Sequence, residues 1–152
     1  LPYTIENAVR VNMIGQVLSM VYLKKIREDA GAAYSCGAEG NATLEDGYHD
    51  YTVLVTCPMK PEKKDTALQI IRQEAKEMTR TCDASMLAKV KEYMLTNTYW
   101  SGVINMYRRY GIDLHARYKE IIKAQTPQDL CNLMKQILQS GNCISVVMLP
   151  QE

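Results

Sequence analysis

Hydrophobic residues recur at helical spacing from residue 4 to residue 28. Thr4 can serve as the N-cap, and Gly31 is suited to the left-handed position just past the last turn. This spacing predicts one long helix, and we expect it to be largely buried because apolar residues cover most of its circumference. The apolar positions include Ile5, Val9, Met13, Val17, Met20 and Ile26.

An alternating pattern follows and predicts a β-hairpin. Residues 33–39 alternate weakly between apolar and polar positions, whereas residues 50–57 alternate clearly. The polar segment 40–47, bounded by glycines, is typical of a connecting loop. Pro58 and Pro61 then end the second strand. One side of that strand carries Tyr51, Val53, Val55 and Cys57.

Helical patterns dominate the middle of the chain. Residues 62–80 predict an amphipathic helix whose dense mixture of Glu, Lys and Arg we interpret as a solvated face. Asp83 can cap a second helix over residues 84–98, and the helical pattern continues through 97–111. Asp113 can cap a further short helix.

The C-terminal part begins with a strong helix-start signal. Thr126, Pro127 and Asp129 combine an N-cap, a proline in the first turn and an acidic residue at the third position. This helix should end at Gly141. Residues 143–149 are nearly all apolar, which predicts a last strand that is central in a sheet.

The order of these elements predicts an α+β fold, with helices packed on one face of a mainly antiparallel sheet. Three strands make a small sheet for so much helix, so we expect further strands upstream of Leu1. The chain has 152 residues, the size of one domain, and starts without Met. We therefore interpret residues 1–152 as a single, truncated domain of a longer protein.

Composition narrows the possible functions. The net charge is +1, which gives no electrostatic reason to expect nucleic acid or a membrane surface as a partner. We therefore interpret the tyrosines near Arg108 and Arg109 as packing residues rather than base-stacking ones. No Cys-x-x-Cys pair occurs, and we interpret the cysteines as small buried hydrophobes. They are Cys36, Cys57, Cys82, Cys131 and Cys143.

Common catalytic motifs are missing from the sequence. His49 and His115 lie far apart, and neither belongs to a zinc-binding helix motif. The sequence also lacks a nucleophile elbow, a Walker loop and a dinucleotide fingerprint. We therefore expect no metal site within this chain.

Arg27 and Tyr34 flank the predicted change from helix to strand. They can be structural: Arg27 suits a helix C-terminus, and Tyr34 is an ordinary strand aromatic. Alternatively, they form a site, because a guanidinium and a phenol both donate hydrogen bonds to a peptide carbonyl or a developing oxyanion.

The stretch "IREDAGAAYS", residues 26–35, resembles the Leu-Arg-Glu-x-x-Gly-x-x-Tyr-Ser junction in the non-metal domain of the pitrilysin/insulinase family of zinc peptidases. The order of the downstream segments is also similar, through "CDASMLAKVKEYML" and "TPQDL" to "ISVVMLP". The resemblance covers essentially the whole chain. Ala30, Ala32 and Ala33 are smaller than the apolar residues common in that family.

This resemblance implies a C-terminal domain that contacts a peptide substrate and faces the zinc-bearing half of the same polypeptide. Tyr34 would be catalytic, donating to the oxyanion, and Arg27 would bind a substrate carbonyl together with Tyr34. No cofactor belongs to this chain itself, whereas zinc belongs to the longer enzyme. By family habit we expect a location in the bacterial periplasm.

Other functions stay open. The chain could be a non-catalytic scaffold of the same fold, like core subunits of respiratory complexes, or a free-standing interaction domain. A sheet edge left bare by missing strands would also favour a homodimer of the isolated chain. The sequence does not determine the peptide substrate.

Overall fold

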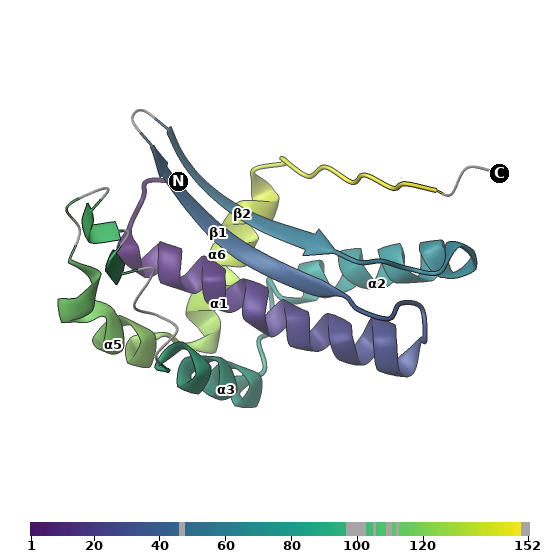
Figure 1. The fold of residues 1–152 in the computed structure, drawn as a ribbon, viewed down its shortest axis with the longest axis horizontal. Helices are drawn as coiled ribbons and strands as arrows, with labels where there is room; N and C mark the ends of the chain where they lie inside the picture. The colour runs from purple at the N-terminus through teal and green to yellow at the C-terminus, as the bar shows by residue number, and fades with distance from the viewer. Residues whose placement is uncertain (46–47, 97–102, 105, 109–110, 112, 150–152) are drawn as a thin grey trace.

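In the computed structural model, one long helix lies against a two-stranded antiparallel hairpin, and the other helices pack on the same face of that hairpin (Figure 1). The structure describes residues 1–45, 48–96, 103–104, 106–108, 111 and 113–149. This arrangement confirms the predicted α+β class with helices on one face of an antiparallel sheet.

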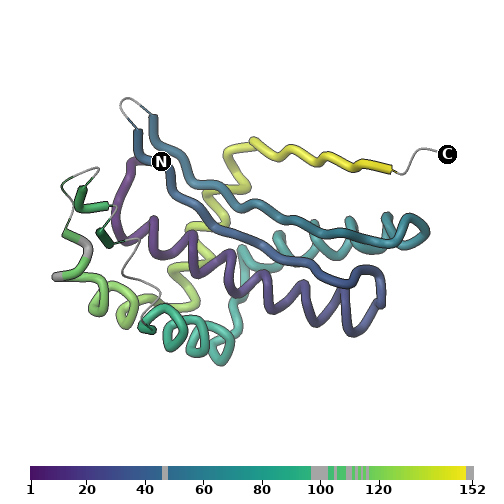
Figure 2. The backbone as a smooth tube through the Cα atoms, in the orientation of Figure 1, coloured from purple at the N-terminus to yellow at the C-terminus, as the bar shows by residue number. Residues whose placement is uncertain are grey.

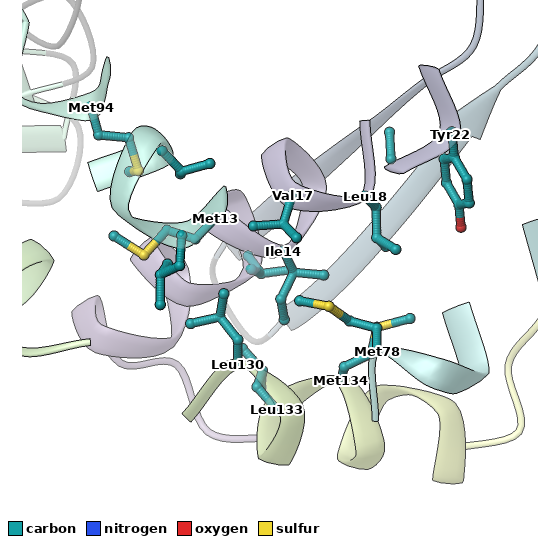
Figure 3. Packing of buried hydrophobic residues seen from close by; sticks show 14 of the residues in the cluster. Met13, Ile14, Val17, Leu18, Tyr22, Met78, Met94, Leu130, Leu133 and Met134 are labelled. Atoms are coloured by element: carbon teal, nitrogen blue, oxygen red, sulfur yellow. The ribbon is translucent and has the colours of Figure 1, made fainter. Parts of the chain in front are cut away.

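Helix α1 (Ile5–Tyr22) forms the centre of the core. The Thr4 side chain accepts a hydrogen bond from the Asn7 backbone N–H, which confirms the predicted cap. Figure 3 shows how side chains of α1 meet those of the other helices in one cluster. The fully buried members from α1 are Val11, Met13, Ile14, Val17, Leu18 and Tyr22.

The chain beyond α1 is helical but not α-helical. The predicted long helix over residues 4–28 is present, but its last part, Leu23–Asp29, is wound as a π-helix. The wider turn keeps Ile26 fully buried and lets its carbonyl accept the Ala32 N–H at 2.8 Å. Gly31 follows with a φ of 57°, which confirms its left-handed conformation.

The hairpin is longer than the sequence pattern predicts. Strand β1 (Gly37–Glu45) pairs with β2 (Tyr48–Thr56), so the prediction of a strand at 33–39 and a loop at 40–47 is wrong. The reason is that β1 is selected for close contact with α1 rather than for strand propensity. Ser19 shows this contact, because its hydroxyl bonds both the N–H and the C=O of Ala38 at 2.7 Å.

The later helices begin where their caps predict. The Asp83 side chain accepts the N–H groups of Ser85 and Met86, and Thr126 and Asp129 form a capping box. The predicted helical segment 97–111 falls largely outside the described residues. The helices are α2 (Lys64–Glu77), α3 (Ala84–Met94), α5 (Leu114–Ala124) and α6 (Pro127–Gln139).

The predicted last strand is wrong. The described residues after α6, 141–149, form no regular secondary structure, and the trace extends away from α6 (Figure 2). The side chains of Ile144, Val146 and Met148 are 90%, 81% and 92% exposed. An apolar segment becomes a strand only when another strand offers its backbone, and none does so within the described ranges.

The cysteines divide by exposure. Cys36 and Cys131 are buried, as predicted for small hydrophobes, and Cys57 and Cys82 are half-buried. Cys143 is exposed, so that interpretation is wrong for this residue.

Candidate functional site

Arg27 and Tyr34 lie on either side of the junction between the π-helical segment Leu23–Asp29 and the hairpin. Arg27 is in the last turn of the π-helical segment, and its side chain is exposed. Tyr34 lies three residues before β1, and its side chain is 82% exposed. Both polar groups are therefore accessible to a partner.

The backbone beneath these side chains is firmly held. Ala32 donates its N–H to Ile26 and accepts the Lys60 N–H at 3.0 Å, while Ala33 forms a β-bridge with Met59. Ala32 and Ala33 are 0% and 5% exposed. The small alanines allow this close approach of the two segments. The exposed Tyr34 side chain therefore extends from a buried, hydrogen-bonded backbone.

Lys60 belongs to the same surface, although the sequence does not single it out. Its ammonium lies 5.9 Å from the centroid of the Tyr34 ring, which is the geometry of a cation–π contact. The bridge between Ala33 and Met59 places the two segments side by side. Lys60 can be identified as a neighbour of Tyr34 only from the pairing of these two segments, and not from the local sequence.

Arg27 is free to bind a partner. Among the residues that the structure describes, its guanidinium makes no hydrogen bond or ion pair, and no such contact joins it to Tyr34. The structure thus places the two predicted site residues at one junction without pairing them. Their five N–H donors and one O–H donor can reach an external acceptor.

An ion pair between an exposed lysine and a largely buried glutamate anchors the π-helical segment to α2. The Lys25 ammonium lies 2.7 Å from a carboxylate oxygen of Glu74, whose side chain is only 10% exposed. A hollow of about 270 Å³ lies beside this pair, between α1, α2 and α3. Neither Arg27 nor Tyr34 lines this hollow. The candidate site is therefore an exposed surface that lies outside this hollow.

The described part of the chain contains no grouping of three or more His, Cys, Asp or Glu side chains that could hold a metal ion. His49 lies on β2 and His115 on α5, and both side chains are exposed. The described histidines therefore do not combine with other ligands into a zinc site. No helix among the described residues is long and apolar enough to cross a membrane.

Solved structures share this fold. The periplasmic protease PqqL from Escherichia coli superposes with a TM-score of 0.68 at 16% identity, over 90% of this chain and 16% of that chain. The ferredoxin protease FusC, solved as a mutant in complex with Arabidopsis ferredoxin, gives a TM-score of 0.62 at 17% identity, over 87% of this chain and 16% of that chain. The chain thus spans about a sixth of either protease. No protein-family model and no curated protein matches the sequence.

These likenesses show the fold of the chain: an α+β unit that superposes on a part of each of these two proteases. The fold is therefore one that this chain shares with the two proteases. At 16% and 17% identity, the likeness establishes the fold alone.

Proposed function

We propose that residues 1–152 form a C-terminal, non-metal domain of a zinc metalloendopeptidase, in which Arg27 and Tyr34 contact the peptide substrate. The observation that carries this proposal is an exposed arginine and an exposed tyrosine on a rigid junction, in a fold shared with two proteases. The partners are the peptide substrate and the zinc-bearing half of the same polypeptide, which would together cover this surface.

In this function each side chain has a separate task. The Tyr34 O–H donates a hydrogen bond to the oxyanion that develops on the scissile carbonyl, and the nearby Lys60 ammonium adds favourable charge. The Arg27 guanidinium, a rigid planar donor, holds a neighbouring carbonyl of the substrate. The buried backbone next to Tyr34 limits the movement of this side chain, and a hydrogen-bond donor to a transition state must be held in place.

The described residues of this chain offer no metal site, so the metal would be held elsewhere in the longer protein. Bound there, zinc supplies an activated water for peptide hydrolysis. The chain by itself is then expected to bind peptide weakly and to hydrolyse none.

The test is peptide hydrolysis by the full-length protein that contains this chain, with the change Tyr34→Phe. Loss of an oxyanion donor typically lowers turnover by about 10²–10³-fold, and Arg27→Ala should mainly raise KM. Tyr93→Phe, which alters another exposed tyrosine, is the matched control and should keep wild-type kinetics. Unchanged turnover of Tyr34→Phe at equal zinc content would exclude the catalytic role.

A second candidate function is a non-catalytic scaffold of the same fold. The observation that favours it is that Arg27 and Tyr34 make no contact with each other in this structure. A full-length protein that binds no zinc and hydrolyses no peptide, yet assembles stably through this domain, would support the scaffold.

A further inference from the structure

Two cysteines face each other where the hairpin meets the candidate site. The register pairs Gly37 with Thr56, and one further step sets Cys36 opposite Cys57. Each cysteine lies one residue beyond its strand and continues the inward-facing series, which includes buried Ala38 on β1 and buried Tyr51 on β2. Their side chains therefore point to the same side of the hairpin.

This placement satisfies the geometry of a disulfide. Opposite residues in an antiparallel pair have Cα atoms about 4.5–5.5 Å apart. A disulfide requires about 4.4–6.8 Å. The pair can thus close with little movement of the backbone, because the strand register already brings the two cysteines together.

The Cys57 thiol also lies close enough to Cys36 to affect its titration. Burial raises the pKa of Cys36, and a side-chain hydrogen bond with Cys57 raises it further. The exposures differ, because Cys36 is only 7% exposed whereas Cys57 is half-buried. An oxidant that arrives from solvent therefore meets Cys57 first.

We propose that Cys36 and Cys57 form a redox-active pair that closes to an intramolecular disulfide when the chain meets a disulfide oxidant such as oxidised glutathione. This inference is independent of the proposed peptidase function. It assigns the two thiols a covalent chemistry that the fold itself prepares.

The reaction takes place in two exchange steps. The Cys57 thiolate attacks one sulfur of oxidised glutathione, breaks its S–S bond and releases one glutathione thiolate. The Cys36 thiolate then attacks the Cys57 sulfur, forms the protein disulfide and releases the second glutathione thiolate. The two protons lost by the cysteines go to the two departing thiolates. The protein is oxidised by two electrons and one oxidised glutathione is reduced.

The raised pKa of Cys36 affects the second step. Since only the thiolate attacks, this step is slow at neutral pH and accelerates as the pH rises toward the pKa of Cys36. The mixed disulfide on Cys57 should therefore accumulate at neutral pH before ring closure.

The disulfide would tie together the two segments that carry Tyr34 and Lys60. Cys36 follows Tyr34 by two residues, and Cys57 precedes Lys60 by three. Oxidation would therefore fix the spacing between the tyrosine and the lysine, whose side chains already contact each other.

The experiment uses the full chain, incubated with oxidised glutathione at mildly alkaline pH, then unfolded, alkylated, digested and analysed by mass spectrometry. The expected product joins the Cys36 and Cys57 peptides with the loss of two hydrogen atoms, and a reductant reverses it. Thermal unfolding should shift upward on oxidation of the wild type and stay unchanged in Cys57→Ser. Circular dichroism of the reduced forms shows whether that variant keeps the fold.

The chain contains its own controls. Exposed Cys143 must become glutathionylated, which shows that the oxidant is active. Cys82 and Cys131 are also neighbours, but Cys82 lies just before α3 and Cys131 lies on α6. No strand register sets the spacing between these two residues. Cys82→Ser should therefore leave the Cys36–Cys57 product unchanged. Full alkylation of Cys36 while Cys143 is modified, or a product that pairs Cys36 with another cysteine, would overturn the proposal.

Discussion

At the scale of single residues, Tyr22 shows how a polar group can be placed inside the core. Its side chain is fully buried, and its O–H donates to the Ile71 carbonyl at 3.1 Å. Burial chiefly raises the pKa of this phenol, and the nearby Cys36 and Glu74 raise it further. Tyr22 therefore joins α1 to α2 only while its proton is bound.

This proton makes the stability of the fold sensitive to alkali. The pKa of Tyr22 is higher in the folded chain than its ordinary value of 10.0, so the folded state holds the proton more tightly. The stabilisation is complete below pH 10 and is lost as the pH rises through the pKa of the folded state. At neutral pH, we expect Tyr22→Phe to have a free energy of unfolding about 1 kcal/mol lower than that of the wild type. When the pH is raised, the free energy of unfolding should fall less in Tyr22→Phe than in the wild type.

Urea unfolding at neutral pH and above pH 10 measures this difference. Tyr34→Phe is the matched control, because its phenol is 82% exposed, and it should follow the wild type at both values. An equal loss of stability in Tyr22→Phe and the wild type above pH 10 would contradict the assigned role.

The sequence predicts some of these residues and not others. Arg27 and Tyr34 can be predicted as candidate site residues from the local sequence, because the end of a helix, a glycine and an aromatic residue follow one another in a recognisable order. The partners of Tyr34 and Tyr22 cannot, because Lys60 and the Ile71 carbonyl come near only through the tertiary fold.

At the scale of elements, α1 and β1 touch backbone to backbone. A Cβ atom added to Gly40 would collide with the Val11 carbonyl, and one added to Gly15 would collide with the backbone of Gly40. Both glycines are buried. Two elements can approach this closely only where neither carries a side chain.

We expect Gly40→Ala to destabilise the fold by about 1–3 kcal/mol or more, because the helix and the strand must separate to admit one methyl group. Gly37→Ala on the same strand is the matched control. Its added Cβ would meet only the Ser19 hydroxyl at 3.7 Å, an ordinary contact, so its stability should stay near that of the wild type. Chemical denaturation measures both. A Gly40→Ala chain as stable as Gly37→Ala would show that this contact is loose.

Helix starts and strand limits differ in how far local sequence determines them. The caps at Thr4, Asp83 and Thr126 are confirmed because each acts within three residues of itself. The predicted limits of the first strand are wrong because the glycines, alanines and asparagine of β1 are weak strand formers. They form a strand since α1 and β2 hold them there.

At the scale of the whole molecule, the helical layer extends past the edge of the hairpin. A groove of about 320 Å³ lies between β2, α2 and α6 and includes the apolar side chains of Val53, Ile71 and Ile137. Cys143 also lines this groove, and the exposed apolar residues 144–149 follow it directly. Among the described residues, the outer edge of β2 and the apolar segment 144–149 thus both lack a strand partner.

We propose that these two features meet between two copies of the chain, with residues 144–149 of one copy added as a strand beside β2 of the other. The segment carries Ile144, Val146 and Met148 on one side, which suits the apolar groove. The net charge of +1 causes little repulsion between copies. Exposed strand edges with apolar neighbours are known to associate in this way.

Sedimentation of the full chain at increasing concentration should therefore show a dimer. Val146→Asp is expected to shift it to a monomer without affecting the fold, because this side chain is 81% exposed. Tyr93→Asp, on the exposed face of α3, is the control and should still dimerise. A wild-type chain that stays monomeric while residues 144–149 resist hydrogen exchange would show that the segment folds onto its own β2 instead.

The sequence predicts the class of the fold but not its complete sheet. Amphipathic helices and one clear alternating segment are enough to indicate an α+β fold, because each pattern shows which face of its helix or strand is buried. The last strand is different. Its apolar pattern is real, but a strand also needs a paired backbone, and no described strand of this chain pairs with residues 143–149.

The π-helical turn after α1 has an angular consequence for everything that follows it. Each residue of a regular α-helix advances the chain by about 100° around the axis, since 3.6 residues complete one turn. A π-type turn closes its hydrogen bonds one residue later than an α-turn, so Leu23–Asp29 takes up one extra residue that would otherwise rotate the following backbone by roughly that angle. The direction in which the junction presents its tyrosine thus depends on the count of residues in one widened turn.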